Sequence, residues 1–245
     1  ETLAILGESG SGKSVSASAI MDLIDIPPGE IASGEVHFDG LNLLQASHEE
    51  RRLITGKRIA MIFQDPLSHL NPVYTIGWQI EDMMTAHGMA RDKARARTLQ
   101  LLQRVGISEA ESRIDAYPHQ LSGGQRQRIM IAMALALKPD ILIADEPTTA
   151  LDVTVQAQIL ALLEELQEET GMGLLLITHD LGVVAEVADR VVVMNSGEIV
   201  ETGTADQIYS DAKHPYTQKL IAAVPGTGEM ATPLEASKPL LEVNG

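Results

Sequence analysis

The feature that most constrains this chain is an eight-residue segment near its start, Gly7-Glu8-Ser9-Gly10-Ser11-Gly12-Lys13-Ser14. It fits the pattern G-x-x-x-x-G-K-[ST], in which a glycine-rich turn wraps backbone N–H groups around a phosphate. An apolar run over residues 3–6 precedes it and predicts a buried strand, and residues 14–23 predict a helix. The start of a helix adds unpaired N–H donors and the positive end of the helix dipole. This order therefore predicts a phosphate-binding loop, in which Lys13 neutralises the outer phosphates and Ser14 ligates Mg²⁺.

Composition narrows the class of protein. The chain has 245 residues, of which 44% are apolar, enough for one large domain or two small ones. It has no cysteine, which excludes disulfides, thiolate metal sites and cysteine nucleophiles. The formal net charge of −16 repels the phosphates of nucleic acids and anionic lipids, and so argues against a broad nucleic-acid-binding face. No apolar run approaches the ~20 residues that a membrane-spanning helix needs.

The order of the predicted elements favours an α/β fold. Continuous apolar runs, typical of strands buried on both faces of a parallel sheet, occur at residues 141–144, 174–177 and 191–194. Apolar residues at helical spacing predict a helix over residues 155–170 that ends at Gly171, and residues 195–197 predict a hairpin turn. Residues 75–137 carry helical patterns with little strand signal. They predict a helical insertion in the α/β core.

Two more motifs are typical of nucleotide chemistry. Asp145 and Glu146 follow an apolar strand, and strand ends of a parallel sheet meet at the edge where the phosphate loop lies. One carboxylate can hold Mg²⁺ through water, and the other can polarise an attacking water. The segment Ser122-Gly123-Gly124-Gln125 begins another predicted helix, with Ser122 as a good N-cap residue, and offers a second anion site. One nucleotide does not need two such sites, which suggests a site shared between two copies.

Taken in order, these motifs resemble those of the nucleotide-binding domains of ATP-binding-cassette (ABC) transporters. The resemblance covers residues 1–225 and includes the Walker A loop at 7–14, Gln64 in Phe63-Gln64-Asp65-Pro66, the signature Leu121-Ser122-Gly123-Gly124-Gln125, Walker B at 141–145, the D-loop Ala150-Leu151-Asp152 and the switch histidine His179. It implies a P-loop NTPase (RecA-like) core with a parallel sheet, a helical subdomain at about 75–137 and a small antiparallel β part. The cofactors that it implies are ATP and Mg²⁺.

The resemblance also implies roles for individual residues. Catalysis would depend on Glu146 as general base, His179, Gln64 and Lys13. ATP would contact Gly7, Ser9, Gly10, Ser11, Gly12, Lys13, Ser14 and Val15, and the Ser122, Gly123, Gly124 and Gln125 of a facing cassette. Mg²⁺ would be held by Ser14, Gln64 and Asp145, and Asp152 would lie at the seam between the two cassettes.

Two segments are similar to the dipeptide and oligopeptide importer branch of the family. They are Leu70-Asn71-Pro72-Val73-Tyr74-Thr75-Ile76-Gly77 and His214-Pro215-Tyr216-Thr217-Gln218-Lys219-Leu220. This branch implies an ATPase subunit that drives peptide uptake at the cytoplasmic face of the bacterial inner membrane. Its partners would be a second cassette, two membrane permease subunits and a periplasmic or lipid-anchored substrate-binding protein, without nucleic acid. Nickel and glutathione importers share the two segments and remain alternatives.

Two other functions are weighed against peptide import. A non-transport ABC ATPase is disfavoured because coiled-coil insertions, zinc modules and basic arms are not seen, and a scaffold without hydrolysis is disfavoured by the intact Lys13 and Glu146.

Because residue 1 already lies in a strand, we expect the chain to begin after the family's adenine-stacking aromatic residue. Residues 226–245 predict a linker, and residues 239–245 resemble the opening strand of a second cassette. The missing cysteines exclude from this segment the iron–sulfur centre of many relatives.

Overall fold

The computed structural model describes residues 1–149 and 151–223. Its strands are β1 (Thr2–Leu6), β2 (His37–Phe38), β3 (Leu41–Asn42), β4 (Ile59–Ile62), β5 (Ile141–Asp145), β6 (Gly173–Thr178), β7 (Arg190–Asn195) and β8 (Glu198–Thr204). Its α-helices are α1 (Lys13–Met21), α2 (His48–Ile54), α3 (Pro66–His69), α4 (Ile76–Ala86), α5 (Arg91–Arg104), α6 (Ala110–Arg113), α7 (Gly123–Ala134), α8 (Val153–Thr170), α9 (Leu181–Val187), α10 (Ala205–Asp211) and α11 (Pro215–Ala222), and a short 3-10 helix covers Pro118–Gln120.

Six strands form one sheet in the order β4-β5-β6-β1-β7-β8. The strands from β4 to β7 are parallel, and only the pair β7 and β8 is antiparallel. A separate two-stranded antiparallel sheet joins β2 and β3. The structure confirms the predicted α/β class, the mostly parallel sheet and the small antiparallel part. It also confirms the strands expected at 141–144, 174–177 and 191–194 and the helix that ends at Gly171.

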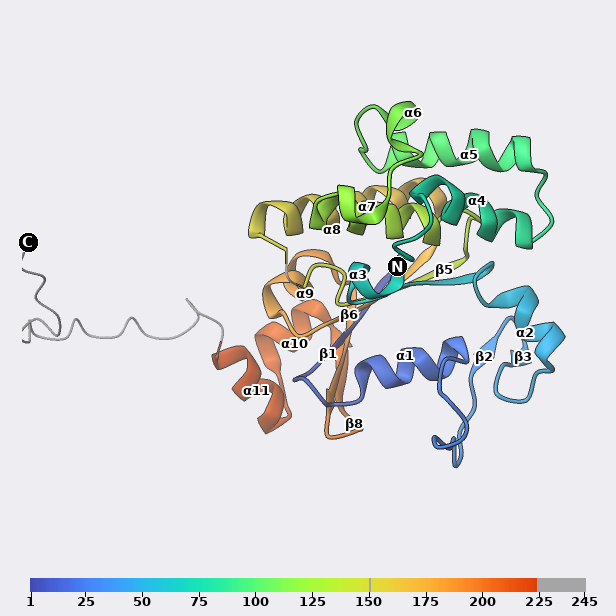
Figure 1. Ribbon diagram of the computed structural model, residues 1–245. Coiled ribbons are helices and arrows are strands. Elements are labelled where there is room, and N and C mark those ends of the chain that lie inside the picture. The colour runs from blue at the N-terminus through green and yellow to red at the C-terminus, as the bar shows by residue number, and fades with distance from the viewer. Residues whose placement is uncertain (150, 224–245) are drawn as a thin grey trace, which may run out of the picture.

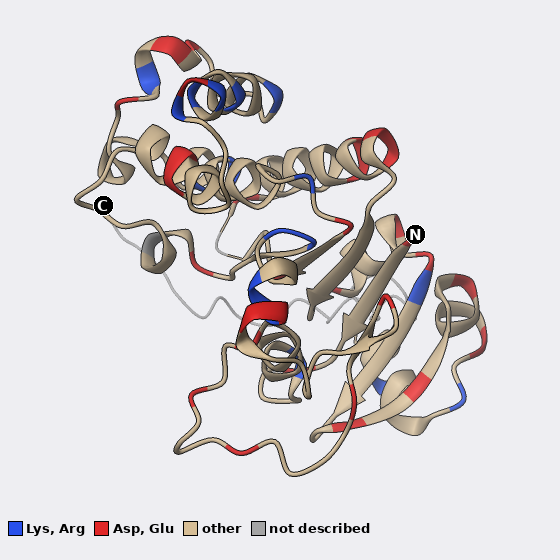
Figure 2. Cartoon of the chain, turned by 90° about the vertical axis from the view of Figure 1, so that its right-hand side faces the viewer, with Lys and Arg blue, Asp and Glu red and all other residues tan. Residues whose placement is uncertain are grey.

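Helices cover both faces of the sheet (Figure 1). Successive side chains of a strand point to opposite faces, so a strand buried on both sides reads as a continuous apolar run. On β5, Ile143 packs in a cluster with Ala17 and Met21 of α1, whereas Leu142 and Ala144 pack with residues of α7 and α8. The strands β1, β4 and β6 contain no charged residue, and charged residues lie mainly on the outer helices and loops (Figure 2).

The helices α4 to α7 follow one another without a strand between residues 76 and 134, and they stand beyond one face of the sheet (Figure 1). Their packed interior includes Ile80, Met84, Leu102 and Ile131, which are all fully buried. These helices lie within residues 75–137, where the sequence carries helical patterns, and their standing as a separate subdomain stays a prediction. The tail expected as a linker at 226–245, with its strand-like end at 239–245, lies outside the described residues.

Candidate functional site

The phosphate loop connects the end of β1 to the start of α1, as the sequence predicts. A Cβ on Gly7 would lie 2.3 Å from the carbonyl oxygen of Met194, so the backbone there leaves room for glycine alone. Gly12 is the N-cap of α1, has a φ of 101°, and gives the helix no side-chain cap. The first N–H groups of α1 are therefore left for another acceptor. Val15 follows on the first turn of α1, with an exposed side chain.

Lys13 lies inside the loop and is only 4% exposed. Its Nζ donates hydrogen bonds to the carbonyl oxygens of Gly7, at 2.7 Å, and of Glu8, at 2.9 Å. Burial lowers the pKa of Lys13, and the negative charges of Glu146 and Asp145 oppose that shift. An ammonium has three donors, so one remains beyond these two bonds. The structure thus places a positive charge in the mouth of the loop, facing two carboxylates.

Ser14 connects the phosphate loop to the end of β5. Its hydroxyl donates to Oδ1 of Asp145 at 2.9 Å. Asp145 is 5% exposed, and burial raises the pKa of its carboxyl group, although the hydrogen bond from Ser14 opposes this shift. The sheet order explains why these residues meet, because only β6 separates β5 from β1. Their oxygens are the hard ligands that Mg²⁺ prefers.

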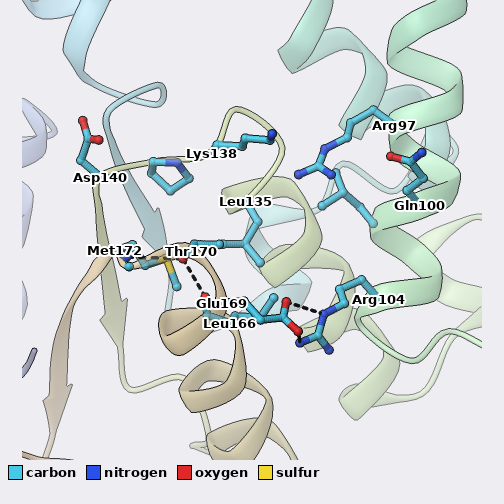
Figure 3. A pocket seen from close by; sticks show the side chains of 13 residues that line it. Arg97, Gln100, Arg104, Leu135, Lys138, Asp140, Leu166, Glu169, Thr170 and Met172 are labelled. Carbon is cyan, nitrogen blue, oxygen red and sulfur yellow. Dashed lines mark hydrogen bonds and ion pairs between the residues drawn. The ribbon is translucent and has the colours of Figure 1, made fainter.

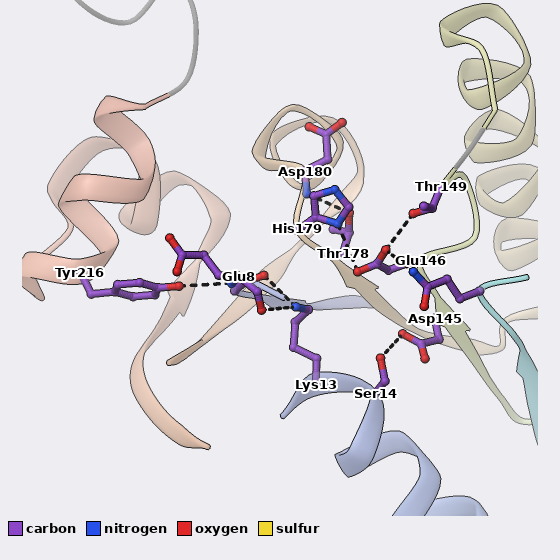
Figure 4. Close-up of polar contacts among 12 residues, drawn as sticks. Glu8, Lys13, Ser14, Asp145, Glu146, Thr149, Thr178, His179, Asp180 and Tyr216 are labelled. Carbon is purple, nitrogen blue, oxygen red and sulfur yellow. Dashed lines mark hydrogen bonds and ion pairs between the residues drawn. The ribbon is translucent and has the colours of Figure 1, made fainter. Parts of the chain in front are cut away.

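Glu146 lies just beyond β5 in an uncommon backbone conformation, with a φ of 45°. Its N–H donates to the carbonyl oxygen of Ile177 at 2.8 Å, which fixes the residue against β6. Its carboxylate accepts hydrogen bonds from Gln64 Nε2 at 2.9 Å and from the Thr149 hydroxyl at 2.8 Å, and it lies 3.1 Å from His179 Nδ1. Figure 4 shows Thr149 and His179 beside this carboxylate. Three side chains from separate segments therefore orient one carboxylate.

These residues surround a cavity of about 420 Å³, lined by Leu6, Gly7, Glu8, Ser9, Gln64, Glu146, Thr149, His179 and Leu220. The structure thus brings together Lys13, Ser14, Gln64, Asp145, Glu146 and His179, six residues that the sequence singles out from four segments. Four lining residues were not assigned a role in the site from the sequence: Leu6, Glu8, Thr149 and Leu220. Leu6 and Glu8 flank Gly7, and Thr149 lies three residues after Glu146 in the turn that leaves β5, so closeness to a motif was the available signal for these three. Leu220 belongs to the segment similar to the importer branch, which did not indicate a contact with the site.

The signature segment lies apart from this cavity. Ser122 caps α7 by accepting the N–H of Gln125 at 3.3 Å, and Gln125 Oε1 accepts the N–H of Ser122 at 3.0 Å. A Cβ on Gly123 would come within 3.7 Å of Leu151, and one on Gly124 would come within 2.8 Å of Val155. The start of α7 therefore packs against the start of α8, where the Asp152 side chain accepts the N–H of Val155 at 3.0 Å. The cavity of this copy is not lined by Asp152 or by any of the four signature residues predicted to bind ATP.

The chemistry of the site fits a nucleoside triphosphate with Mg²⁺. Inside the loop the Ser11 hydroxyl is buried without a hydrogen-bond partner, and a phosphate oxygen would supply one. In the described part of the chain, no cluster of three or more His, Asp or Glu side chains could hold a metal ion by itself. A magnesium ion here would thus depend on phosphate oxygens in addition to Ser14, Gln64 and Asp145, as is usual for this ion.

A larger hollow, of about 700 Å³, lies between α5 and the C-terminal end of α8 (Figure 3). It contains none of the motif residues. Arg104 of α5 pairs there with Glu169 at 2.6 Å and with Glu165 at 3.3 Å, which ties the helical part to α8. Without a glycine-rich loop or a paired acid and base, it offers no equivalent chemistry.

Comparisons with known proteins show the family of this chain. Residues 1–149 match the ABC transporter family, and residues 200–242 match the oligopeptide/dipeptide transporter C-terminal region. The dipeptide transport ATP-binding protein DppD of Haemophilus influenzae is 55% identical over 96% of this chain and 72% of its own length. The oligopeptide transport ATP-binding protein OppD of Bacillus subtilis is 54% identical, over 92% of this chain and 63% of its own length. A glutathione import ATP-binding protein of Pectobacterium atrosepticum is 54% identical over all of this chain, which spans 40% of that relative.

Solved structures show the same fold. A dimeric post-hydrolysis form of the ATP-binding cassette MJ0796, bound to ADP and Pi, superposes with a TM-score of 0.72 at 32% identity, covering 84% of this chain and 85% of that one. The protein cbiO1 of Clostridium perfringens gives a TM-score of 0.73 at 30% identity, with 86% and 80% of the two chains covered. The fold and the phosphate loop define a P-loop ATPase. The chain belongs to the ABC transporter family, and it is an ATP-binding ATPase domain of that family.

Proposed function

We propose that this chain hydrolyses ATP to drive the uptake of dipeptides or oligopeptides through membrane subunits. The match to the oligopeptide/dipeptide C-terminal region and the names of the relatives from Haemophilus influenzae and Bacillus subtilis support the substrate class. The observation that carries the ATPase activity is the meeting of Lys13, Ser14, Asp145 and Glu146 at the phosphate loop, beside a cavity that Glu146 lines.

In this proposal the loop binds the triphosphate and Glu146 activates water. The N–H groups from Ser9 to Ser14 and the ammonium of Lys13 stabilise the negative charge that develops during phosphoryl transfer. Mg²⁺, held by Ser14, Gln64 and Asp145, would supply charge neutralisation at the outer phosphates. Glu146 is the general base, because its carboxylate is oriented by three neighbours and borders the cavity. His179, which lies 3.1 Å from that carboxylate, would contact the γ-phosphate.

A second cassette completes the site. Ser122, Gly123, Gly124 and Gln125 form a helix start outside the cavity of their own copy, so they are free to face the γ-phosphate of a partner. Asp152 lies at the same seam, since the start of α8 packs against the start of α7. ATP would then hold two cassettes together, and hydrolysis would release them. The dimeric form of the similar cassette bound to ADP and Pi supports this arrangement.

The membrane subunits would contact the segment that follows Gln64. Val73 is 69% exposed, and Tyr74 and Trp78 stack with ring centroids 4.0 Å apart while remaining exposed. Exposed aromatic groups of this kind are enriched at protein interfaces. None of the helices in residues 1–149 and 151–223 has both the length and the apolar character of a membrane span.

Because the relatives are named as transport ATP-binding proteins, we place the chain at the cytoplasmic face of the bacterial inner membrane. Its partners would be two permease subunits and a periplasmic or lipid-anchored substrate-binding protein.

Transport by the purified complex in liposomes tests this function. Vesicles loaded with ATP and Mg²⁺ should take up a labelled di- or oligopeptide when the substrate-binding protein is present, and ATP hydrolysis should rise with uptake. Labelled glutathione serves as the competing substrate, because a relative of equal identity is a glutathione import protein. Uptake of glutathione without peptide uptake would contradict the peptide proposal, and no ATP hydrolysis by the complex would contradict the ATPase proposal itself.

A further inference from the structure

The last described helix, α11, touches the phosphate loop. The hydroxyl oxygen of Tyr216 accepts a hydrogen bond from the N–H of Glu8 at 3.2 Å. One turn further along α11, Leu220 lines the same cavity as Gly7 and Glu8. Figure 4 shows the Tyr216 ring reaching from α11 toward the loop. These two side chains are separated from the loop by more than 200 positions in the sequence, and the proposed chemistry assigns neither of them a role.

The position of α11 is fixed by β8. The carboxylate of Glu201 accepts the N–H of Lys213 at 2.6 Å and the N–H of His214 at 3.0 Å. His214 Nδ1 in turn accepts the N–H of Tyr216 at 3.2 Å and caps the helix. The Tyr216 hydroxyl is thus held in place from the sheet.

The bond from Glu8 acts on the peptide unit that holds Lys13. The Gly7–Glu8 peptide donates its N–H to Tyr216, and its carbonyl, that of Gly7, accepts from Lys13 Nζ at 2.7 Å. Because Gly7 has no Cβ, rotation of this peptide is restrained little by its own side chain. A rotation would break both bonds together and carry the carbonyl away from Lys13.

We propose that Tyr216 is a positioning residue of the phosphate loop. Its hydroxyl fixes the orientation of the Gly7–Glu8 peptide, and this keeps Lys13 in the mouth of the loop before ATP arrives. The role rests on the proposed ATPase function. An ordered loop loses less conformational freedom on binding, so the hydroxyl strengthens ATP binding and leaves the hydrolytic step to Glu146.

The test is Tyr216→Phe in the complete protein, with its transport partners, measured beside Tyr209→Phe. The control removes a hydroxyl from the neighbouring helix α10 that donates to the Leu181 carbonyl and makes no contact with the loop. Tyr216→Phe should raise the KM for ATP about 3- to 10-fold, the usual effect of one hydrogen bond, with kcat within about twofold and an unchanged Tm. Tyr209→Phe should lower the Tm and leave the KM for ATP unchanged.

Calorimetry of ATP binding, in EDTA and then with Mg²⁺, separates the possible failures. If the unsubstituted protein binds no ATP, the proposed function is wrong, and the role of Tyr216 is wrong with it. If the unsubstituted protein binds ATP and Tyr216→Phe binds it equally well, only the positioning role is overturned. A rise in KM accompanied by a fall in Tm like that of Tyr209→Phe would also overturn it, since general destabilisation would then account for the change.

Discussion

The hydroxyl of Ser14 and Oδ1 of Asp145 lie 2.9 Å apart, although 131 positions separate the two residues in the chain. This bond joins the first turn of α1 to the end of β5 and sets two side-chain oxygens side by side. Glu146, the next residue, turns its carboxylate toward Gln64, Thr149 and His179. The group that would hold Mg²⁺ and the group that would activate water are therefore adjacent residues with different hydrogen-bond partners. Their roles can be separated by substitution.

Replacing Glu146 with Gln should stop turnover while ATP still binds. The amide keeps the shape of the side chain but cannot accept a proton from water, and loss of a general base costs roughly 10²- to 10⁴-fold in rate. We expect phosphate release to fall by that factor and the dissociation constant for ATP to change little. Glu186→Gln, at an exposed position on α9, is the matched control and should hydrolyse ATP normally. A Glu146→Gln protein with a near-normal rate would show that another group activates water.

Replacing Lys13 with Ala should weaken ATP binding about tenfold or more, because a charged hydrogen-bond donor in a buried site is removed. Lys13 is buried and close to Asp145 and Glu146, so its loss also leaves those carboxylates without a nearby positive charge. Calorimetric titration with ATP checks the prediction, with Lys93→Ala on the exposed side of α5 as control. Equal affinity in the two variants would refute the role of Lys13 in binding phosphates.

Replacing Ser122 with Asp should abolish ATP-dependent dimerisation. Asp is also a good N-cap residue, so α7 should still begin at Gly123, but its negative charge would face the γ-phosphate of the partner. The effect is measured by light scattering on Glu146→Gln protein with ATP and Mg²⁺. Ser47→Asp makes the same change at the capping box of α2 and should still dimerise. If the Ser122→Asp variant still dimerises with ATP, the signature segment is not part of the dimer interface.

Much of the fold could be predicted because buried parallel strands show as continuous apolar runs. The strand at 141–145 and the carboxylates at its end follow from the pattern alone. The strands β2 and β3 have two residues each, which is too short for such a run, and they pair with each other. The strand β4 is a four-residue apolar run without a motif of its own, so the run does not reveal its place in the sheet, which depends on pairing with the distant strand β5.

Only some contacts of the candidate site could likewise be predicted from the sequence. Lys13, Ser14, Asp145 and Glu146 lie in motifs whose spacing encodes their geometry. The contact of Thr149 with Glu146 depends on the left-handed backbone of Glu146, and the contact of Tyr216 with Glu8 depends on how β8 seats α11. Neither backbone angles nor the docking of a helix can be read from residue spacing. The role proposed for Ser122 to Gln125 involves a second copy, so no feature within a single chain could test it.

Replacing Glu201 with Gln should make the protein less stable at neutral pH and remove part of its sensitivity to acid. Partial burial raises the pKa of Glu201, but the N–H donors of Lys213 and His214 outweigh that effect, so the pKa lies below its ordinary value. A carboxyl group whose pKa is lower in the folded state stabilises the fold above its unfolded pKa, about 4.3, and this stabilisation is lost as the pH falls through the folded pKa.

Above about pH 5 we therefore expect Glu201→Gln to lower the free energy of unfolding by roughly 1 kcal/mol, or the Tm by about 2–4 °C. The difference from the unsubstituted protein should shrink as the pH is lowered below about 4, because the native carboxyl group is then protonated as well. Thermal unfolding across this pH range is the measurement. Glu198→Gln removes the same charge from an exposed position on β8 and should show no such difference. A destabilisation of Glu201→Gln that stayed constant from pH 7 to pH 3 would mean that packing, and not the ionised carboxylate, holds α11 against β8.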